Sequence, residues 1–124
     1  MKNSGFTLKK RLKSFCYAFN GVFLLLRYEH NAWIHASVAL CVIVAGSLIG
    51  LSSTEWLFIV VAIGTVLAAE AINSSIEALS DLVSPEYNEA IKRTKDLAAG
   101  AVLILSIAAA ITGLIIFLPK LTLL

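Results

Sequence analysis

Four polar residues that could carry chemistry interrupt an otherwise apolar part of the chain. They are Glu70, Asn73, Glu77 and Asp81, in the segment AEAINSSIEALSD. Spacings of three, seven and eleven residues return to nearly the same side of an α-helix, so the four side chains are expected to share one face. A carboxylate in lipid is costly, and those found there usually serve a function. Glu70, which follows a long apolar run, is therefore the strongest candidate for a functional group.

The composition indicates a small integral membrane protein. The chain has 124 residues, of which 59% are hydrophobic and 15% charged, and its mean hydropathy is +0.88. A soluble domain of this length could not bury so much apolar surface. The net charge of +2 is too small to suggest nucleic-acid binding. Cys16 and Cys41 lie in apolar surroundings with no partner spacing, so both are expected to be small buried hydrophobic side chains and to form neither a disulfide nor a metal site.

The apolar pattern predicts one domain over residues 1–124, built only from helices. Residues 6–28 carry an apolar stripe with basic residues near the start, which predicts an amphipathic helix on the membrane surface. Three apolar runs follow, at 32–51, 56–79 and 97–118. Each has about the ~20 residues that cross ~30 Å of hydrocarbon. Residues 84–96 are expected to connect the second run to the third, and Pro119 is expected to end the third.

The distribution of basic residues predicts the orientation. Six precede the first run and three lie between the second and third: Lys2, Lys9, Lys10, Arg11, Lys13 and Arg27, then Lys92, Arg93 and Lys95. The connection after the first run has none, and Lys120 is the only one in the C-terminal tail. Because basic loops stay in the cytoplasm, the N-terminus and the 84–96 connection are expected on that side.

The polar residues could meet at the cytoplasmic side of the membrane. At 1.5 Å per residue, Glu70 lies about 21 Å along the helix from Trp56. This depth is shared by the ends of the neighbouring segments, which carry Glu29, Lys95 and Asp96. Carboxylate oxygens suit magnesium, a lysine can meet a phosphate, and a carboxylate beside them could take a proton from a lipid hydroxyl. The group is suited to phosphoryl transfer, although spacing alone does not establish it.

Three segments resemble the prokaryotic diacylglycerol kinase family, which includes the undecaprenol kinases. They are EAINSSIEALSD, SPEYNEAIKRTKDLAAGAVL and the earlier YAFNG followed by Glu29. The resemblance implies a bundle of three transmembrane helices with an N-terminal surface helix, assembled as a homotrimer with active sites shared between subunits. It also implies ATP and Mg²⁺ without a Walker loop, and the sequence contains no G-x-x-x-x-G-K-[ST] motif.

The resemblance also implies roles for individual residues. Glu70 matches the general base, Glu29 and Glu77 match the magnesium ligands, and Asn73, Lys95 and Asp96 match the polar groups around the phosphates. Glu70 and Ala99 fall on the substrate side. The ATP contacts are expected at Lys10, Tyr17, Glu29, Glu77, Glu86, Tyr87, Asn88, Lys95 and Asp96, although relatives often have arginine at the position of Lys10. Ala32 and Trp33 depart from the usual Phe-Arg pair, and His35 is expected to make a structural or headgroup contact.

The leading prediction is therefore an ATP- and Mg²⁺-dependent lipid kinase of the bacterial inner membrane. Its substrate is a membrane alcohol, with diacylglycerol and undecaprenol both open, since both present a hydroxyl and keep their tails in lipid. One alternative is a small proton-coupled transporter that uses Glu70, and another is a structural membrane subunit without chemistry. The transporter needs no Lys95 or Asp96, and the structural subunit leaves Glu70, Asn73 and Glu77 unexplained.

Overall fold

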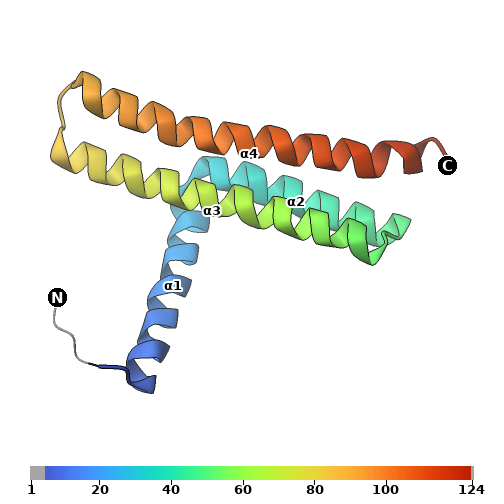
Figure 1. Cartoon of the computed structure of the whole chain (residues 1–124), viewed down its shortest axis with the longest axis horizontal. Helices are drawn as coiled ribbons and strands as arrows, with labels where there is room; N and C mark the ends of the chain where they lie inside the picture. Colours follow the sequence, from blue (N-terminus) through green and yellow to red (C-terminus); the bar gives the residue numbers. More distant parts are fainter. Residues whose placement is uncertain (1–4, 124) are drawn as a thin grey trace.

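The computed structural model describes residues 5–123, which form four α-helices. They are α1 (Leu8–Tyr28), α2 (His30–Ile49), α3 (Ser53–Val83) and α4 (Glu89–Leu121). Helices α2, α3 and α4 lie side by side along the long axis, whereas α1 projects steeply away from them (Figure 1). The all-helical prediction is confirmed. Lys2, one of the basic residues used to predict the orientation, lies outside the described residues.

Short connections join α1 to α2 and α2 to α3. A single extended residue, Glu29, separates α1 from α2. Just beyond this corner, the indole Nε1 of Trp33 donates a hydrogen bond to the carbonyl oxygen of Leu26. At the far end of α2, Gly50 has a φ of 90°, a conformation that glycine adopts at little cost. The side chain of Trp56 packs against Gly46, where an added Cβ would come within 2.9 Å of the indole.

Capping side chains fix where α3 and α4 begin. The Ser52 hydroxyl accepts a hydrogen bond from the Glu55 backbone N–H, and the Glu55 carboxylate accepts one from the Ser52 N–H. This reciprocal pair is a capping box. At the start of α4, the Asn88 side chain accepts hydrogen bonds from the N–H groups of Ala90 and Ile91. Both helices therefore start at residues that satisfy their first free N–H groups.

Two ion pairs link α3 and α4 at opposite ends of their contact. Lys95 Nζ lies 2.8 Å from Asp81 Oδ1, and Lys120 Nζ lies 3.1 Å from Glu55 Oε1. Helices α3 and α4 also make the most extensive contact among the described elements. Because the two pairs lie at either end of the same antiparallel packing, they define which levels of α3 and α4 face each other.

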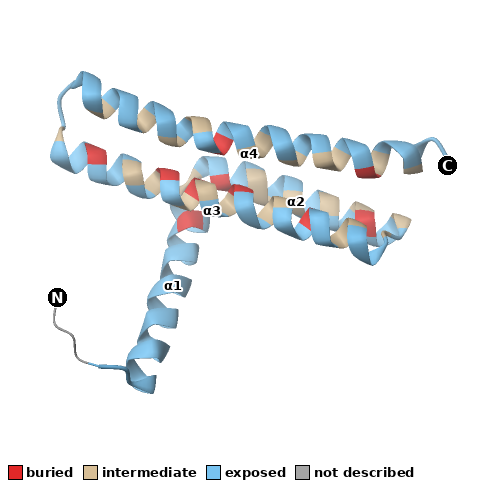
Figure 2. Cartoon of the chain, in the orientation of Figure 1, coloured by how far each residue is buried: buried red, intermediate tan, exposed pale blue. Residues whose placement is uncertain are grey.

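Most apolar side chains face outward, as expected for helices that meet lipid (Figure 2). Cys16 and Cys41 are exposed as well, so the prediction that both are buried is wrong. The few buried apolar residues are Leu25, Ala32, Ile59, Val66, Val102 and Ile116. Three helices, α2, α3 and α4, are long and apolar enough to cross a membrane. With 31 and 33 residues, α3 and α4 exceed the ~20 residues needed for a crossing, so their ends extend beyond the hydrocarbon.

Two expected boundaries are wrong. The connection between the second and third apolar runs was expected to cover 84–96, but α4 already begins at Glu89. The polar residues from Glu89 to Asp96 are helical because Asn88 caps the helix and the segment is rich in good helix formers. Pro119 also does not end the third helix, which continues to Leu121. Near a C-terminus, proline removes one backbone hydrogen bond and leaves the last turn in place.

Candidate active site

The buried face of α3 changes from apolar to polar along its length. Ile59 and Val66 are buried in its first half, and Glu70, Asn73 and Ser80 are buried in its second half. These positions follow helical spacing, so they form one stripe. Burying polar groups costs free energy unless they find partners. The second half of α3 therefore contains polar groups that packing alone does not require.

Glu70 is the acidic residue of this buried stripe, whereas Glu77 and Asp81 further along α3 are exposed. The Glu70 side chain is 3% exposed, and its Oε1 lies 3.2 Å from Nε2 of His35 on α2. The His35 side chain is 25% exposed. The carboxylate of Glu70 is thus buried inside the helix bundle, and its neighbouring polar group is the imidazole of His35.

Asn73 and Glu77 form a second polar pair one turn further along α3. Asn73 Nδ2 donates a hydrogen bond of 2.8 Å to Glu77 Oε1. The other polar atom of this amide, Asn73 Oδ1, is buried without a hydrogen-bond partner among the described residues. An amide oxygen and a carboxylate therefore lie together, with one oxygen free to accept a further bond.

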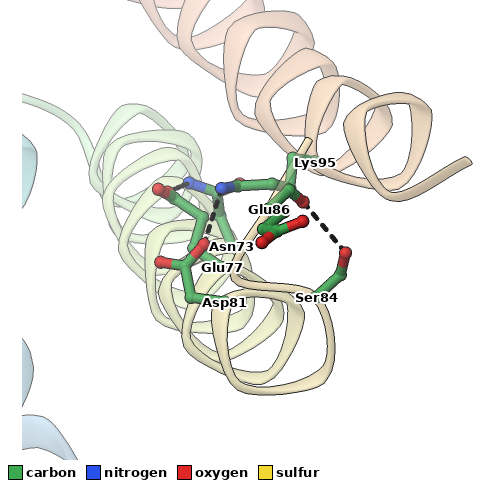
Figure 3. A network of polar contacts seen from close by, with 6 residues as sticks. All are labelled: Asn73, Glu77, Asp81, Ser84, Glu86 and Lys95. Carbon is green, nitrogen blue, oxygen red and sulfur yellow. Dashed lines mark hydrogen bonds and ion pairs between the residues drawn. The ribbon is translucent and has the colours of Figure 1, made fainter. Parts of the chain in front are cut away.

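Lys95 extends from α4 toward the carboxylates of α3 (Figure 3). Its ammonium group donates to Asp81 Oδ1 at 2.8 Å, and Glu77 is near enough to add an electrostatic attraction. Close to this network, the Ser84 hydroxyl donates a hydrogen bond to the backbone oxygen of Glu86. The end of α3 and the start of α4 thus form one polar region that contains a cation and two carboxylates.

Asp96 lies on a different side of α4 from Lys95. Its carboxylate pairs with Lys92 of the same helix at 2.6 Å, and both side chains are exposed. Asp96 and Lys92 line a surface hollow of about 670 Å³, together with Tyr87 and Arg93. Successive helical residues point about 100° apart. Lys95 and Asp96 within one chain therefore face separate regions.

The remaining predicted site residues are distributed as follows. Glu29 occupies the corner between α1 and α2 and is partly exposed. Tyr17, Tyr87, Glu86 and Ala99 are exposed, and the Asn88 side chain caps α4. The backbone N–H of Lys10 bonds to the Thr7 hydroxyl. Among residues 5–123, no group of three or more His, Cys, Asp or Glu side chains could hold a metal ion.

Two polar residues inside the helix bundle, His35 and Ser106, were not predicted as site residues. His35 was expected to make a structural or headgroup contact, and nothing in its own sequence context points to Glu70 on another helix. Ser106 was not considered, yet its Oγ is buried without a hydrogen-bond partner among the described residues. Its signal in the sequence is a hydroxyl inside a long apolar run, which is weak because serine is common in membrane helices.

Comparison with known proteins identifies the family. Residues 16–117 match the model for prokaryotic diacylglycerol kinase. An undecaprenol kinase of Bacillus subtilis (strain 168) is 40% identical over 114 residues, covering 92% of this chain and 93% of its own. A diacylglycerol kinase of Synechocystis is 36% identical over 121 residues, covering 97% of this chain and 69% of its own.

A third relative is more distant, and it carries the same description as the second. A diacylglycerol kinase of Helicobacter pylori is 31% identical over 108 residues, covering 82% of this chain and 84% of its own. The family match extends over nearly the whole bundle, and its range of residues 16–117 contains the polar half of α3. They do not favour the proton-coupled transporter. The chain belongs to the prokaryotic diacylglycerol kinase family and is a lipid kinase.

Proposed function

We propose that the protein transfers the γ-phosphate of ATP to the hydroxyl of a membrane alcohol, with Mg²⁺ as its cofactor. The observation that carries this proposal is the buried polar half of α3, where Glu70 and Asn73 lie among apolar residues. A purely structural membrane subunit has no need of such groups, because buried carboxylates are costly. The family membership supports the same reaction class.

Four residues are proposed to make up the catalytic group. Glu70 supplies the basic centre for the lipid hydroxyl, and Asn73 keeps the adjoining carboxylate of Glu77 in place. Lys95 and Asp96 act around the phosphates. A lysine ammonium can stabilise the negative charge of a transferring phosphoryl group. In the free chain the same ammonium is held by Asp81, which keeps it at the polar end of α3.

The donor atoms present fit magnesium. Asn73 Oδ1 is a buried oxygen without a partner among residues 5–123, and it belongs to the side chain that bonds Glu77. Glu77 and Glu29 are the proposed ligands, and both offer the oxygen atoms that this hard cation prefers. When bound, the ion would neutralise charge on the phosphates. Two protein carboxylates suffice for magnesium, which normally keeps waters and phosphate oxygens as its other ligands.

The nucleotide is proposed to lie near the exposed loop and the start of α4. The hollow lined by Tyr87, Lys92, Arg93 and Asp96 combines two cations with an aromatic ring, which suits phosphates and a base. Further contacts are proposed for Lys10, Tyr17, Glu86 and Asn88. The side-chain oxygen Oδ1 of Asn88 already caps α4, so the N–H₂ group of the same side chain is the part available to a ligand.

The active site is proposed to face the cytoplasm and to be shared between subunits of a homotrimer. The basic residues of α1 and of the start of α4 support this orientation. In this arrangement α1 is an amphipathic helix on the membrane surface, and its many exposed apolar residues meet the lipid interface. Within one chain, Asp96 lies apart from the region around Lys95 and Glu77. A neighbouring subunit would bring the two regions into one site.

Diacylglycerol and undecaprenol are the proposed substrates, and Ala99 with Glu70 is proposed to lie on the lipid side. The test is ATP consumption by the purified protein in detergent, with and without each alcohol. A lipid kinase should consume ATP at a rate that rises with added alcohol and requires Mg²⁺. Consumption that ignores the alcohol, or none at all from folded protein, would contradict the proposal.

A further inference from the structure

The proposed magnesium ligand Glu29 is the single residue between α1 and α2, and its backbone serves both helices. Its N–H donates a hydrogen bond of 3.1 Å to the carbonyl oxygen of Leu25 in the last turn of α1. Its own carbonyl oxygen accepts a hydrogen bond of 3.3 Å from the N–H of Trp33 near the start of α2. Its carboxylate makes no capping hydrogen bond to α2. The backbone of Glu29 is therefore held by the two helices, whereas its side chain remains available to a ligand.

This corner is also where α1 is anchored to the rest of the chain. Leu25 is the one residue of α1 that is buried, and Ala32, three residues after Glu29, is fully buried. The rest of α1 projects away from the long helices (Figure 1). Because each residue has two soft backbone torsions, a rotation at Glu29 would turn α1 and would also redirect the Glu29 carboxylate.

The indole of Trp33 joins the two helices across the corner. Its Nε1–H donates a hydrogen bond to the carbonyl oxygen of Leu26, on the other side of Glu29. The last four carbonyl groups of an α-helix have no partner within the helix, and that of Leu26 is one of them. The ring of His30, the first residue of α2, packs edge to face against the indole, with the ring centroids 5.1 Å apart. The side chain of Trp33 thus satisfies an end group of α1 and is itself held by α2.

The position of a magnesium ligand has a strong effect on how tightly the ion is bound. Magnesium requires a nearly octahedral arrangement of oxygen atoms at ~2.0–2.1 Å. Groups that hold a metal ligand in place without touching the metal commonly contribute ~10–100-fold to metal affinity. A contact that fixes the chain on both sides of Glu29 is therefore expected to influence the ion.

We propose that Trp33 is a positioning residue for the magnesium site. Its indole N–H fixes the corner between α1 and α2 and thereby keeps the Glu29 carboxylate in the direction that the ion requires. This inference rests on the proposed function, in which Glu29 is a magnesium ligand. The property of Trp33 that matters is the N–H donor, so another long side chain with such a donor should replace it, whereas an aromatic ring without one should not.

Three substitutions at position 33 separate the donor from the ring. Trp33→Phe keeps an aromatic ring beside His30 and removes the donor, whereas Trp33→Leu removes both. Trp33→Arg removes the ring and keeps N–H donors, and its positive charge suits the C-terminal end of α1. The matched control is Trp56→Phe, the same change at the far end of α2, where the indole packs against Gly46.

Metal binding is measured directly, by electron paramagnetic resonance of Mn²⁺ with a non-hydrolysable ATP analogue in detergent. Mn²⁺ prefers the same octahedral oxygen ligands as magnesium. We expect Trp33→Phe and Trp33→Leu to weaken Mn²⁺ binding ~10–100-fold, and Trp33→Arg and Trp56→Phe to stay near wild type. In a Glu29→Gln background, Trp33→Phe should cause no further loss, because the two residues act on the same bond to the metal. The Mg²⁺ requirement of lipid phosphorylation should rise in parallel, with kcat at saturating Mg²⁺ near the wild-type value.

Wild-type Mn²⁺ affinity in Trp33→Phe and Trp33→Leu would overturn the inference. Equal losses in Trp33→Phe and Trp33→Arg would also overturn it, because the donor would then be irrelevant. An undiminished effect of Trp33→Phe in the Glu29→Gln background would show that Trp33 does not act through Glu29.

Thermal unfolding in the same detergent is the control for stability. Loss of folding in both variants that lack a donor would make the indole structural, which would overturn the inference as well. The metal measurement needs no phosphate transfer. Folded wild-type protein that binds Mn²⁺ and transfers no phosphate would therefore contradict the proposed function, while the Mn²⁺ affinities of the variants would still decide the role of Trp33.

Discussion

Helix α3 carries one glutamate near each end of its apolar half, and the two are bonded differently. Glu55 accepts a hydrogen bond from the Ser52 N–H and pairs with Lys120, and its side chain is 27% exposed. Glu70 is 3% exposed, and Nε2 of the His35 imidazole lies 3.2 Å from its carboxylate oxygen Oε1. Glu55 thus completes the cap at the start of α3 and links α3 to α4. These structural roles are enough to explain why a glutamate occurs at this position.

The contrast shows where the fold contains more polar groups than it needs. At the Glu55 end, the capping box and one ion pair account for the polar side chains. Beyond Glu70, α3 buries Asn73 and Ser80 as well, and Asn73 Oδ1 has no partner among residues 5–123. Buried polar atoms left unsatisfied are rare in native proteins and call for an explanation. A binding or catalytic function at this end supplies one.

The largest expected effect comes from Glu70→Gln. Loss of the carboxylate should lower lipid phosphorylation by ~10²–10⁴-fold, because it removes the group on which proton transfer depends. Binding of ATP should change much less, and stability should hold or rise, since a neutral amide costs less in the membrane than a carboxylate. Rates, ATP affinity and thermal unfolding are measured in one detergent. Glu55→Gln is the matched control and should keep wild-type turnover. A fully active Glu70→Gln protein would rule out Glu70 as the proposed base.

A smaller effect is expected at the proposed magnesium ligands. Glu77→Gln keeps an oxygen that can accept the hydrogen bond from Asn73, so the local structure should persist. The Mg²⁺ concentration for half-maximal activity should rise at least ~10-fold, since even indirect partners of metal ligands contribute that much to affinity. Glu29→Gln should act in the same direction. Magnesium titrations of the lipid kinase activity test both, and unchanged titrations in both variants would refute the ligand assignment.

Mixed oligomers should show partial recovery of activity. If Glu29 of one subunit completes a site with Glu70 and Glu77 of another, chains carrying Glu29→Gln and chains carrying Glu70→Gln should together rebuild some intact sites. The two proteins are co-expressed with different tags, and mixed oligomers are isolated by sequential affinity steps before assay. Oligomers of each variant alone are the controls. Absence of any recovery in verified mixed oligomers would indicate that each site lies within one subunit.

The smallest effect is expected at the other end of α3. Glu55→Gln and Lys120→Gln each remove a partly exposed ion pair, and such pairs contribute little to stability. Glutamine at position 55 can still complete the capping box with Ser52. Thermal unfolding should therefore shift only slightly, and the double variant should resemble either single variant. A large loss of turnover in these variants would show that this end of the bundle also contributes to catalysis.

Much of this fold follows from the sequence, because lengths of apolar runs determine which helices can cross a membrane. The start of α4 at Glu89 and its continuation past Pro119 did not follow from the sequence. The first depends on the cap at Asn88, and the second depends on how well the last helical turn tolerates a proline. The polar face of α3 followed from helical spacing around Glu70. Its pairing with His35 could not be predicted, because it depends on how α2 packs against α3 and no local pattern encodes that contact.

The most direct test of the account is phosphate transfer from ATP to diacylglycerol and to undecaprenol, measured side by side in the same mixed micelles with Mg²⁺. Wild-type and Glu55→Gln proteins should phosphorylate at least one of the two alcohols, and Glu70→Gln should do so ~10²–10⁴-fold more slowly. The preferred alcohol then identifies the substrate. Folded wild-type protein that phosphorylates neither lipid, or equal rates for Glu70→Gln and wild type, would contradict the proposal that the polar half of α3 carries out lipid phosphorylation.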